Sequence, residues 1–243
     1  MNNNDTKHVE NTATENYGKS EPWPDNDIWH SHTYSILHKY VQDKLNEICL
    51  DNTQIVLNAG CGRTTYETQA TIIYMDIIKE YINMFENYIV GSVENIPLPD
   101  NSVDCVICVG SVLNYVDIQK TLLEFCRILK PNGVLILEYE RSNSAEFLFT
   151  KNYARTVFMQ KYSYNDQTHF LWMYNERFVL HLAKFYNFVC KEKYRYHNIS
   201  SLLFRFGVSE ERAAKFSKYD NFIQTFSYPI SHNQILILKK IVL

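Results

Sequence analysis

The chain of 243 residues has no apolar stretch approaching the ~20 residues of a membrane span, and residues 1–20 are polar, without the apolar core of a signal peptide. It also has no basic run, since 24 Lys and Arg stand against 27 Asp and Glu, for a net charge of −3. These absences argue against a membrane protein and against a surface that binds nucleic-acid phosphates. We therefore expect a cytosolic protein that acts on a small molecule, and the sequence leaves its oligomeric state open.

No metal pattern is present among the six cysteines and eight histidines. Cys105 and Cys108 form a CxxC, but it lies in an apolar strand, where residues three apart point to opposite faces. His30 and His32 lack partners at metal-ligand spacing. We expect reduced thiols and no metal site.

The length predicts a single domain. Residues 1–27 are rich in Asn, Thr, Glu and Lys and poor in aliphatic side chains, which predicts a flexible N-terminal arm ahead of a domain over 28–243.

Helical and strand patterns alternate through this domain. The apolar spacing predicts helices over 31–49, 78–85 and 175–186, and another that Asp117 caps and Pro131-Asn132-Gly133 ends. Strands are expected over 54–57, 71–75, 88–90, 103–109, 134–139, 188–196 and 234–241. Such alternation specifies an α/β fold with a mostly parallel sheet, and a last strand reached without a crossover helix pairs antiparallel.

The most informative segment is Asn58-Ala59-Gly60-Cys61-Gly62, which follows the β-branched run Ile55-Val56-Leu57. Glycines let the backbone turn sharply and expose its amides to a ligand. Asp76 closes the next apolar run, and a strand-end carboxylate can accept hydrogen bonds from both hydroxyls of a ribose. The pattern predicts a nucleotide-cofactor loop.

Three further segments follow in order: residues 91–100 with the sequence GSVENIPLPD, residues 104–115, and residues 129–135 with the sequence LKPNGVL. The series over 55–140 resembles class I S-adenosylmethionine-dependent methyltransferases of the small-molecule type, similar to methyltransferase type 11. The resemblance implies a Rossmann-like sheet of seven strands in the order 3-2-1-4-5-7-6 and S-adenosyl-L-methionine as cofactor. Within that pattern Asn58 stands for an acid, Thr64 for a glycine and Ser92 for a second acid.

The resemblance also implies cofactor contacts. Gly60 and Gly62 would shape the methionine side of the site, Asp76 would bind the ribose, and Asn58 could accept a hydrogen bond from the ammonium. The adenine would lie against Ile77 and Val93, and the methyl group beside the end of the fourth strand. The implied cofactor-binding residues are Asn58, Gly60, Cys61, Gly62, Asp76, Ile77, Ser92, Val93, Gly110 and Ser111.

Two insertions, 141–175 and 198–230, leave the carboxyl edge of the sheet, where open α/β folds bind ligands. They hold 16 of the 35 aromatic residues and are expected to form helical lids over the site. Alternatively, their aromatic side chains form a small core of their own. Candidate polar groups for the substrate are Arg141, Asp166, His169 and Tyr174.

We interpret the chain as a methyltransferase that acts on an O or N atom of a small molecule. Where the acceptor must lose a proton, a positioned base contributes about 10² to 10⁴ in rate. His169, which Asp166 could orient, and Asn114 are the candidate catalytic residues; each has the alternative of a purely structural role. Two other functions stay open: an inactive cofactor-binding or partner-binding subunit, and an enzyme that uses a modified sulfonium cofactor, with Arg63 as a carboxylate partner.

Overall fold

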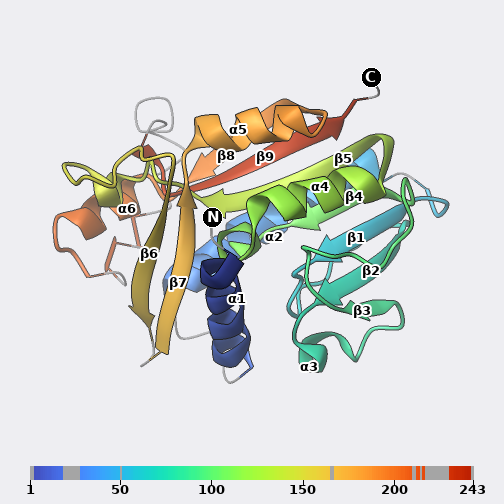
Figure 1. Ribbon diagram of the computed structural model, residues 1–243, viewed down its shortest axis with the longest axis horizontal. Helices are drawn as coiled ribbons and strands as arrows, with labels where there is room; N and C mark the ends of the chain where they lie inside the picture. The colour runs from blue at the N-terminus through green and yellow to red at the C-terminus, as the bar shows by residue number, and fades with distance from the viewer. Residues whose placement is uncertain are drawn as a thin grey trace.

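The computed structural model of the protein describes residues 3–18, 28–49, 51–164, 167–209, 212–213, 215–216 and 230–241. At its centre is a seven-stranded sheet with helices on both faces, and a two-stranded hairpin stands beside it (Figure 1). The sheet contains β1 (Ile55–Ala59), β2 (Thr71–Asp76), β3 (Tyr88–Val90), β4 (Val103–Cys108), β5 (Leu129–Glu140), β8 (Phe188–Tyr196) and β9 (Asn233–Lys240).

The strand order is β3-β2-β1-β4-β5-β9-β8. The first five strands are parallel, and β9 runs antiparallel to both β5 and β8. Counted within this sheet alone, the order is the expected 3-2-1-4-5-7-6; the labels differ because β6 and β7 belong to the hairpin. The expected Rossmann-like sheet is confirmed.

Alternate residues of the central strands pack into two different cores, as a pleated sheet requires. On one face, Val106 and Cys108 of β4 pack with Leu122 and Phe125 of α4 (Ile118–Ile128), and α5 (Glu176–Phe185) extends this layer. On the other face, Cys105 and its strand neighbour Ile107 pack against α2 (Ile28–Ile48). Cys105 and Cys108 therefore do point to opposite faces.

The sequence predicted how α4 begins and how it ends, and the structure bears out the beginning. The Asp117 carboxylate accepts hydrogen bonds from the N–H groups of Gln119 and Lys120 and begins α4. The Pro131-Asn132-Gly133 segment does not precede β5 but lies inside it, where the pairing register with β4 shifts. Asn132 adopts a φ of 67° there, a left-handed conformation that asparagine tolerates.

The helix expected over 78–85 is much shorter. Only α3 (Lys79–Ile82) forms, a single turn that Asn83 closes by donating to the Lys79 carbonyl. The chain then runs on into β3, and Phe85 stacks on Tyr74 of β2 with ring centroids 3.7 Å apart.

The first insertion is not helical. After a 3₁₀ turn, η2 (Ala145–Phe147), it forms an antiparallel hairpin of β6 (Val157–Tyr164) and β7 (Gln167–Tyr174). One face of the hairpin is buried: Phe158, Leu171 and Met173 pack in a small separate core with Phe147. Of the second insertion, α6 (Ile199–Arg205) is a helix, and most of 210–229 lies outside the described residues.

The N-terminal residues differ most from the expected flexible arm. Residues Asn3–Tyr17 form α1, which packs on β7. Val9 and Ala13 lie one turn apart and are buried, and the Asn16 side chain donates to the Thr168 carbonyl at 2.8 Å. A few apolar side chains at helical spacing thus suffice to dock a polar segment. Among the described residues, no helix combines the length and apolar character needed to cross a membrane.

Candidate functional site

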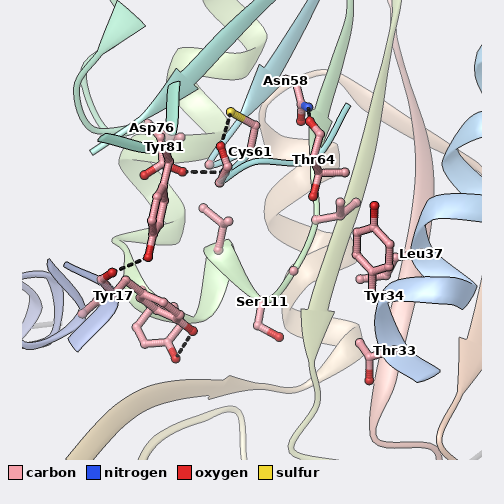
Figure 2. Close-up of a pocket in the computed structure, with 18 of the residues that line it drawn as sticks. Tyr17, Thr33, Tyr34, Leu37, Asn58, Cys61, Thr64, Asp76, Tyr81 and Ser111 are labelled. Carbon is pink, nitrogen blue, oxygen red and sulfur yellow. Dashed lines mark hydrogen bonds between the residues drawn. The ribbon is translucent and has the colours of Figure 1, made fainter. Parts of the chain in front are cut away.

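A cavity opens at the carboxyl ends of β1, β2, β4 and β5. Figure 2 shows its walls: the loop after β1 and Asp76 on one side, α2 with Tyr34 and Leu37 on another, Tyr17 of α1, and Ser111 between them. All ten residues expected to bind cofactor line this one cavity: Asn58, Gly60, Cys61, Gly62, Asp76, Ile77, Ser92, Val93, Gly110 and Ser111. The parallel sheet brings them together because its strand ends share an edge.

The loop after β1 depends on its glycines. Gly60 and Gly62 have φ angles of 68° and 54°, in the left-handed region. The N–H groups of Gly60 and Cys61 both donate to the Met75 carbonyl, at 2.7 and 3.1 Å, which ties the loop to β2. A Cβ atom on Gly60 would lie 2.8 Å from Val112 Cγ1 and nearer still to Cγ2. Only glycine fits this approach of two segments.

Asp76 supports the same loop from the neighbouring strand. Its carboxylate accepts hydrogen bonds from the N–H of Gly62 at 2.8 Å and from the N–H of Ile78 at 2.9 Å. Burial raises the pKa of this carboxyl, and these backbone donors oppose that rise. The acid therefore holds the turn as well as facing the cavity.

The contacts of Asn58 explain why an amide stands where the family pattern has an acid. Its side-chain amide donates to the Thr64 carbonyl at 3.1 Å and closes the loop (Figure 2). An aspartate has no N–H with which to make this bond, so the amide is the side chain that this loop requires.

A buried carboxylate shapes the opposite wall of the cavity. Glu138 of β5 accepts from the N–H groups of Gly110 and Ser111, at 3.0 and 2.7 Å, and from Tyr196 and Asn233 with its other oxygen. Gly110 and Ser111 have φ angles of 82° and 60°. Glu138 thus secures a left-handed turn that would otherwise be costly for Ser111.

Two residues further along β5, Glu140 lines the cavity itself. Its oxygens bond Ser111 Oγ at 2.9 Å and His232 Nε2 at 3.2 Å. Burial opposes ionisation of Glu140 and of His232, but the attraction between the two groups outweighs it. The pKa of His232 is therefore raised and the pKa of Glu140 is lowered. The pair therefore favours a carboxylate beside an imidazolium.

Tyrosines close the cavity from the N-terminal side. The Tyr17 hydroxyl lies 3.1 Å from the Tyr115 hydroxyl, and Tyr81 donates to the Tyr17 carbonyl (Figure 2). Among the described residues, no residue of 141–175 or 198–230 lines the cavity. The described part of the first insertion lies one layer further out, where the hairpin supports α1.

His169 and Asn114 do not line the cavity. His169 is buried on β7 behind the tyrosines, with Nδ1 3.5 Å from the Tyr115 hydroxyl, and burial lowers its pKa. Asn114 is fully buried; its amide donates to the carbonyls of Glu140 and Trp172 and accepts from the Glu140 N–H. These contacts favour structural roles for both. Asp166, the expected partner of His169, lies outside the described residues.

The other polar candidates also have structural partners. Arg141 is buried and bonds Ser231 and Glu176, and the Tyr174 hydroxyl donates to the Val116 carbonyl at 3.2 Å. The Arg63 guanidinium lies over the Tyr81 ring, 5.2 Å from its centroid, and is not part of the lining.

Sequence reasoning missed Tyr17, Glu140 and His232. Signals for all three were present: Val9, Ala13 and Tyr17 are four residues apart, Glu140 ends a strand whose carboxyl edge was already identified, and His232 directly precedes the antiparallel strand β9. Because β9 begins where β5 ends, with Asn233 opposite Glu140, the antiparallel pairing alone predicts that His232 lies at the site.

Residues 57–137, about a third of the chain, match the family model of the methyltransferase domain. A ubiquinone/menaquinone biosynthesis C-methyltransferase from Rickettsia massiliae is 41% identical over 63 residues, which cover 25% of this chain and 25% of that protein. The chain thus matches only about a quarter of the length of this curated relative.

The fold is shared with solved structures. A methyltransferase dependent on S-adenosylmethionine from Archaeoglobus fulgidus has a TM-score of 0.53 and 16% identity, covering 84% of this chain and 94% of that one. A 1,6-didemethyltoxoflavin-N1-methyltransferase from Burkholderia thailandensis, solved with 1,6-didemethyltoxoflavin and S-adenosylhomocysteine, has a TM-score of 0.55 and 12% identity, covering 98% and 89%. These matches confirm the resemblance to class I methyltransferases.

Proposed function

We propose that this protein transfers a methyl group from S-adenosylmethionine to an O or N atom of a small molecule. The observation that carries the proposal is the convergence of all ten expected cofactor residues on one cavity at the carboxyl edge of the sheet. When bound, S-adenosylmethionine supplies a methyl group already activated on a sulfonium sulfur.

The residues present fit this cofactor. The left-handed turn at Gly60 and Gly62 lets the backbone approach a ligand, and Asp76 offers a buried carboxylate to the ribose hydroxyls. Ile77 and Val93 give apolar walls for the adenine, and Ser111 lies at the end of β4 for the methyl side. Asp76 serves both loop and ligand because each carboxylate oxygen has more than one acceptor site.

The chain contributes to the reaction by alignment and by exclusion of water. The tyrosines of α1 and η1 (Val112–Tyr115) narrow the cavity on one side, and the first turns of α2 narrow it on another. Glu140 lies on the side of the cavity where the methyl group is expected, and its carboxylate can accept a hydrogen bond from the substrate that receives the methyl group.

Calorimetric titration with S-adenosylhomocysteine tests the cofactor assignment, with an expected Kd on the order of 1 μM. Incubation with S-adenosylmethionine and a library of small amines, phenols and carboxylates, followed by mass spectrometry, tests transfer. A protein that shows neither heat nor a thermal shift with either cofactor form at millimolar concentration is better described as a partner-binding subunit.

A further inference from the structure

We propose that the acceptor is an amine, held by the Glu140 carboxylate and the aromatic side chains around it. This inference rests on the proposed function and specifies its substrate class. Glu140 is the one carboxylate among the described residues of the cavity lining besides Asp76, and it lies at the Ser111 end, away from the loop that Asp76 supports.

Glu140 retains capacity for a ligand. A carboxylate has about four acceptor sites. Ser111 bonds one oxygen of Glu140 and His232 the other, and the His30 imidazole acts on the same carboxylate through its charge. These two partners fix the carboxylate in place, since Ser111 is held in turn by Glu138 and His232 by Ser144 at 3.0 Å. A fixed, partly satisfied carboxylate is suited to a hydrogen-bond donor or a cation.

The charges around the site favour a cation. Among the described residues that line the cavity there is no Lys or Arg, and the groups that can carry positive charge are the imidazoles of His30, His38 and His232. His232 is already shared between Glu140 and, at 3.5 Å, Glu146. An anionic acceptor would meet two lining carboxylates without a matching guanidinium or ammonium.

Aromatic faces complete the site. Trp29, Tyr34, Tyr17 and Tyr115 line the same cavity. The Trp29 ring meets the His232 ring edge-on, with centroids 6.3 Å apart, and Tyr17 and Tyr115 meet at 5.7 Å. A cation over such rings gains about 0.5 to 2 kcal/mol.

Glu140 and the aromatic rings lie where positive charge would develop on the substrate nitrogen. A bound ammonium first releases one proton to water. The lone pair of the resulting neutral amine then forms the new N–C bond, the C–S bond breaks with its electron pair remaining on sulfur, and the positive charge moves to nitrogen. The aromatic faces and the Glu140 carboxylate stabilise that charge, and Glu140 accepts a hydrogen bond from the N–H of the ammonium product. A hydroxyl acceptor would need Glu140 only to remove a proton.

Three probes of one size separate these cases: phenethylamine, 2-phenylethanol and 3-phenylpropionate, titrated into protein saturated with S-adenosylhomocysteine. We expect the amine to bind about tenfold more tightly than the alcohol, and the acid least tightly. Glu140→Gln should lower amine affinity to that of the alcohol and leave the affinity for S-adenosylhomocysteine within about threefold of wild type. The matched control is Asp43→Asn, an exposed carboxylate on α2 paired with Lys39, which should change nothing.

Two results with the probes overturn the inference: equal binding of amine and alcohol, or amine binding unchanged in Glu140→Gln. A third is a loss of S-adenosylmethionine affinity in that variant without a loss of S-adenosylhomocysteine affinity, because Glu140 would then interact with the sulfonium of the cofactor. If Glu140→Gln does not fold, Trp29→Leu takes its place and should weaken the amine more than the alcohol; the wild-type probe series decides without any variant. Failure of S-adenosylhomocysteine to bind refutes the proposed function itself, whereas its binding without amine preference refutes only this inference.

Discussion

Replacing Gly60 by alanine tests the central claim about the cofactor loop. The backbone there has φ of 68°, and the added Cβ would lie 2.8 Å from one γ carbon of Val112 and closer to the other. Both penalties act within the protein, before any ligand arrives. The substitution should therefore weaken folding as well as cofactor binding.

The magnitude has two parts. A left-handed conformation costs a non-glycine residue about 1 to 2 kcal/mol. Forcing a methyl group against Val112 adds about 1 to 3 kcal/mol, the usual cost of an overpacked core. We expect the free energy of unfolding to fall by about 2 to 5 kcal/mol in total.

Gly207 provides a matched control for the first part. It has φ of 83°, but a Cβ there would meet no atom within 4 Å. Gly207→Ala should therefore show the conformational cost alone, about 1 to 2 kcal/mol. Val112→Ala removes both γ carbons and should restore much of the remainder when combined with Gly60→Ala.

Urea unfolding of the four proteins and of the double variant measures these terms, with a coupling between positions 60 and 112 of about 1 kcal/mol or more. Calorimetry with S-adenosylhomocysteine follows the loop in the same samples. Equal costs at Gly60 and Gly207, or additive effects of Gly60→Ala and Val112→Ala, would refute the clash. A Gly60→Ala variant with wild-type affinity would show that the loop does not approach the cofactor.

Three other predictions concern side chains of the site. Asp76→Ala should lower S-adenosylhomocysteine affinity about ten- to a hundredfold, because charge-assisted hydrogen bonds are worth about 1.5 to 3 kcal/mol. Asn114→Ala should destabilise the fold by about 1 to 3 kcal/mol by leaving buried backbone groups unpaired, with cofactor affinity nearly unchanged. The Glu140–His232 pair should stabilise the fold most between about pH 4.5 and 6.5, the ordinary pKa values of its members. The raised pKa of His232 makes its contribution fade as pH rises through a value above 6.5, and the lowered pKa of Glu140 makes its contribution fade as pH falls through a value below 4.5.

Each has a contradicting outcome. Asp76→Asn, which keeps one acceptor oxygen, should lose less affinity than Asp76→Ala; equal loss would make the charge irrelevant. An Asn114→Ala protein of wild-type stability but without turnover would restore Asn114 to the mechanism. For the ion pair, unfolding free energy is measured against pH in wild type and in His232→Gln, and identical curves would show that the pair does not contribute.

Much of the fold could be predicted from the sequence because the residues that specify each element lie close together in the chain. The β-branched runs, the glycines at 60 and 62 and the Asp117 cap each determine their element within a few residues, and parallel strands then share one edge. That edge rule is why the ten residues expected to bind the cofactor, spread over 54 positions of sequence, all line one cavity. The same rule does not bring His169 to the cavity lining, because the hairpin that carries it packs behind Tyr115.

The sequence by itself determined the strands of the sheet and the glycine loop, since these depend on period and turn chemistry, and the resemblance to class I methyltransferases supplied the strand order. Only the tertiary structure decided what covers the cavity and what faces the methyl side. Helix α1 is polar, and docking on β7 is what makes its few apolar side chains sufficient to order it. The Glu140–His232 pair joins residues 92 positions apart, and such a contact arises only when antiparallel β9 brings the two chain segments together.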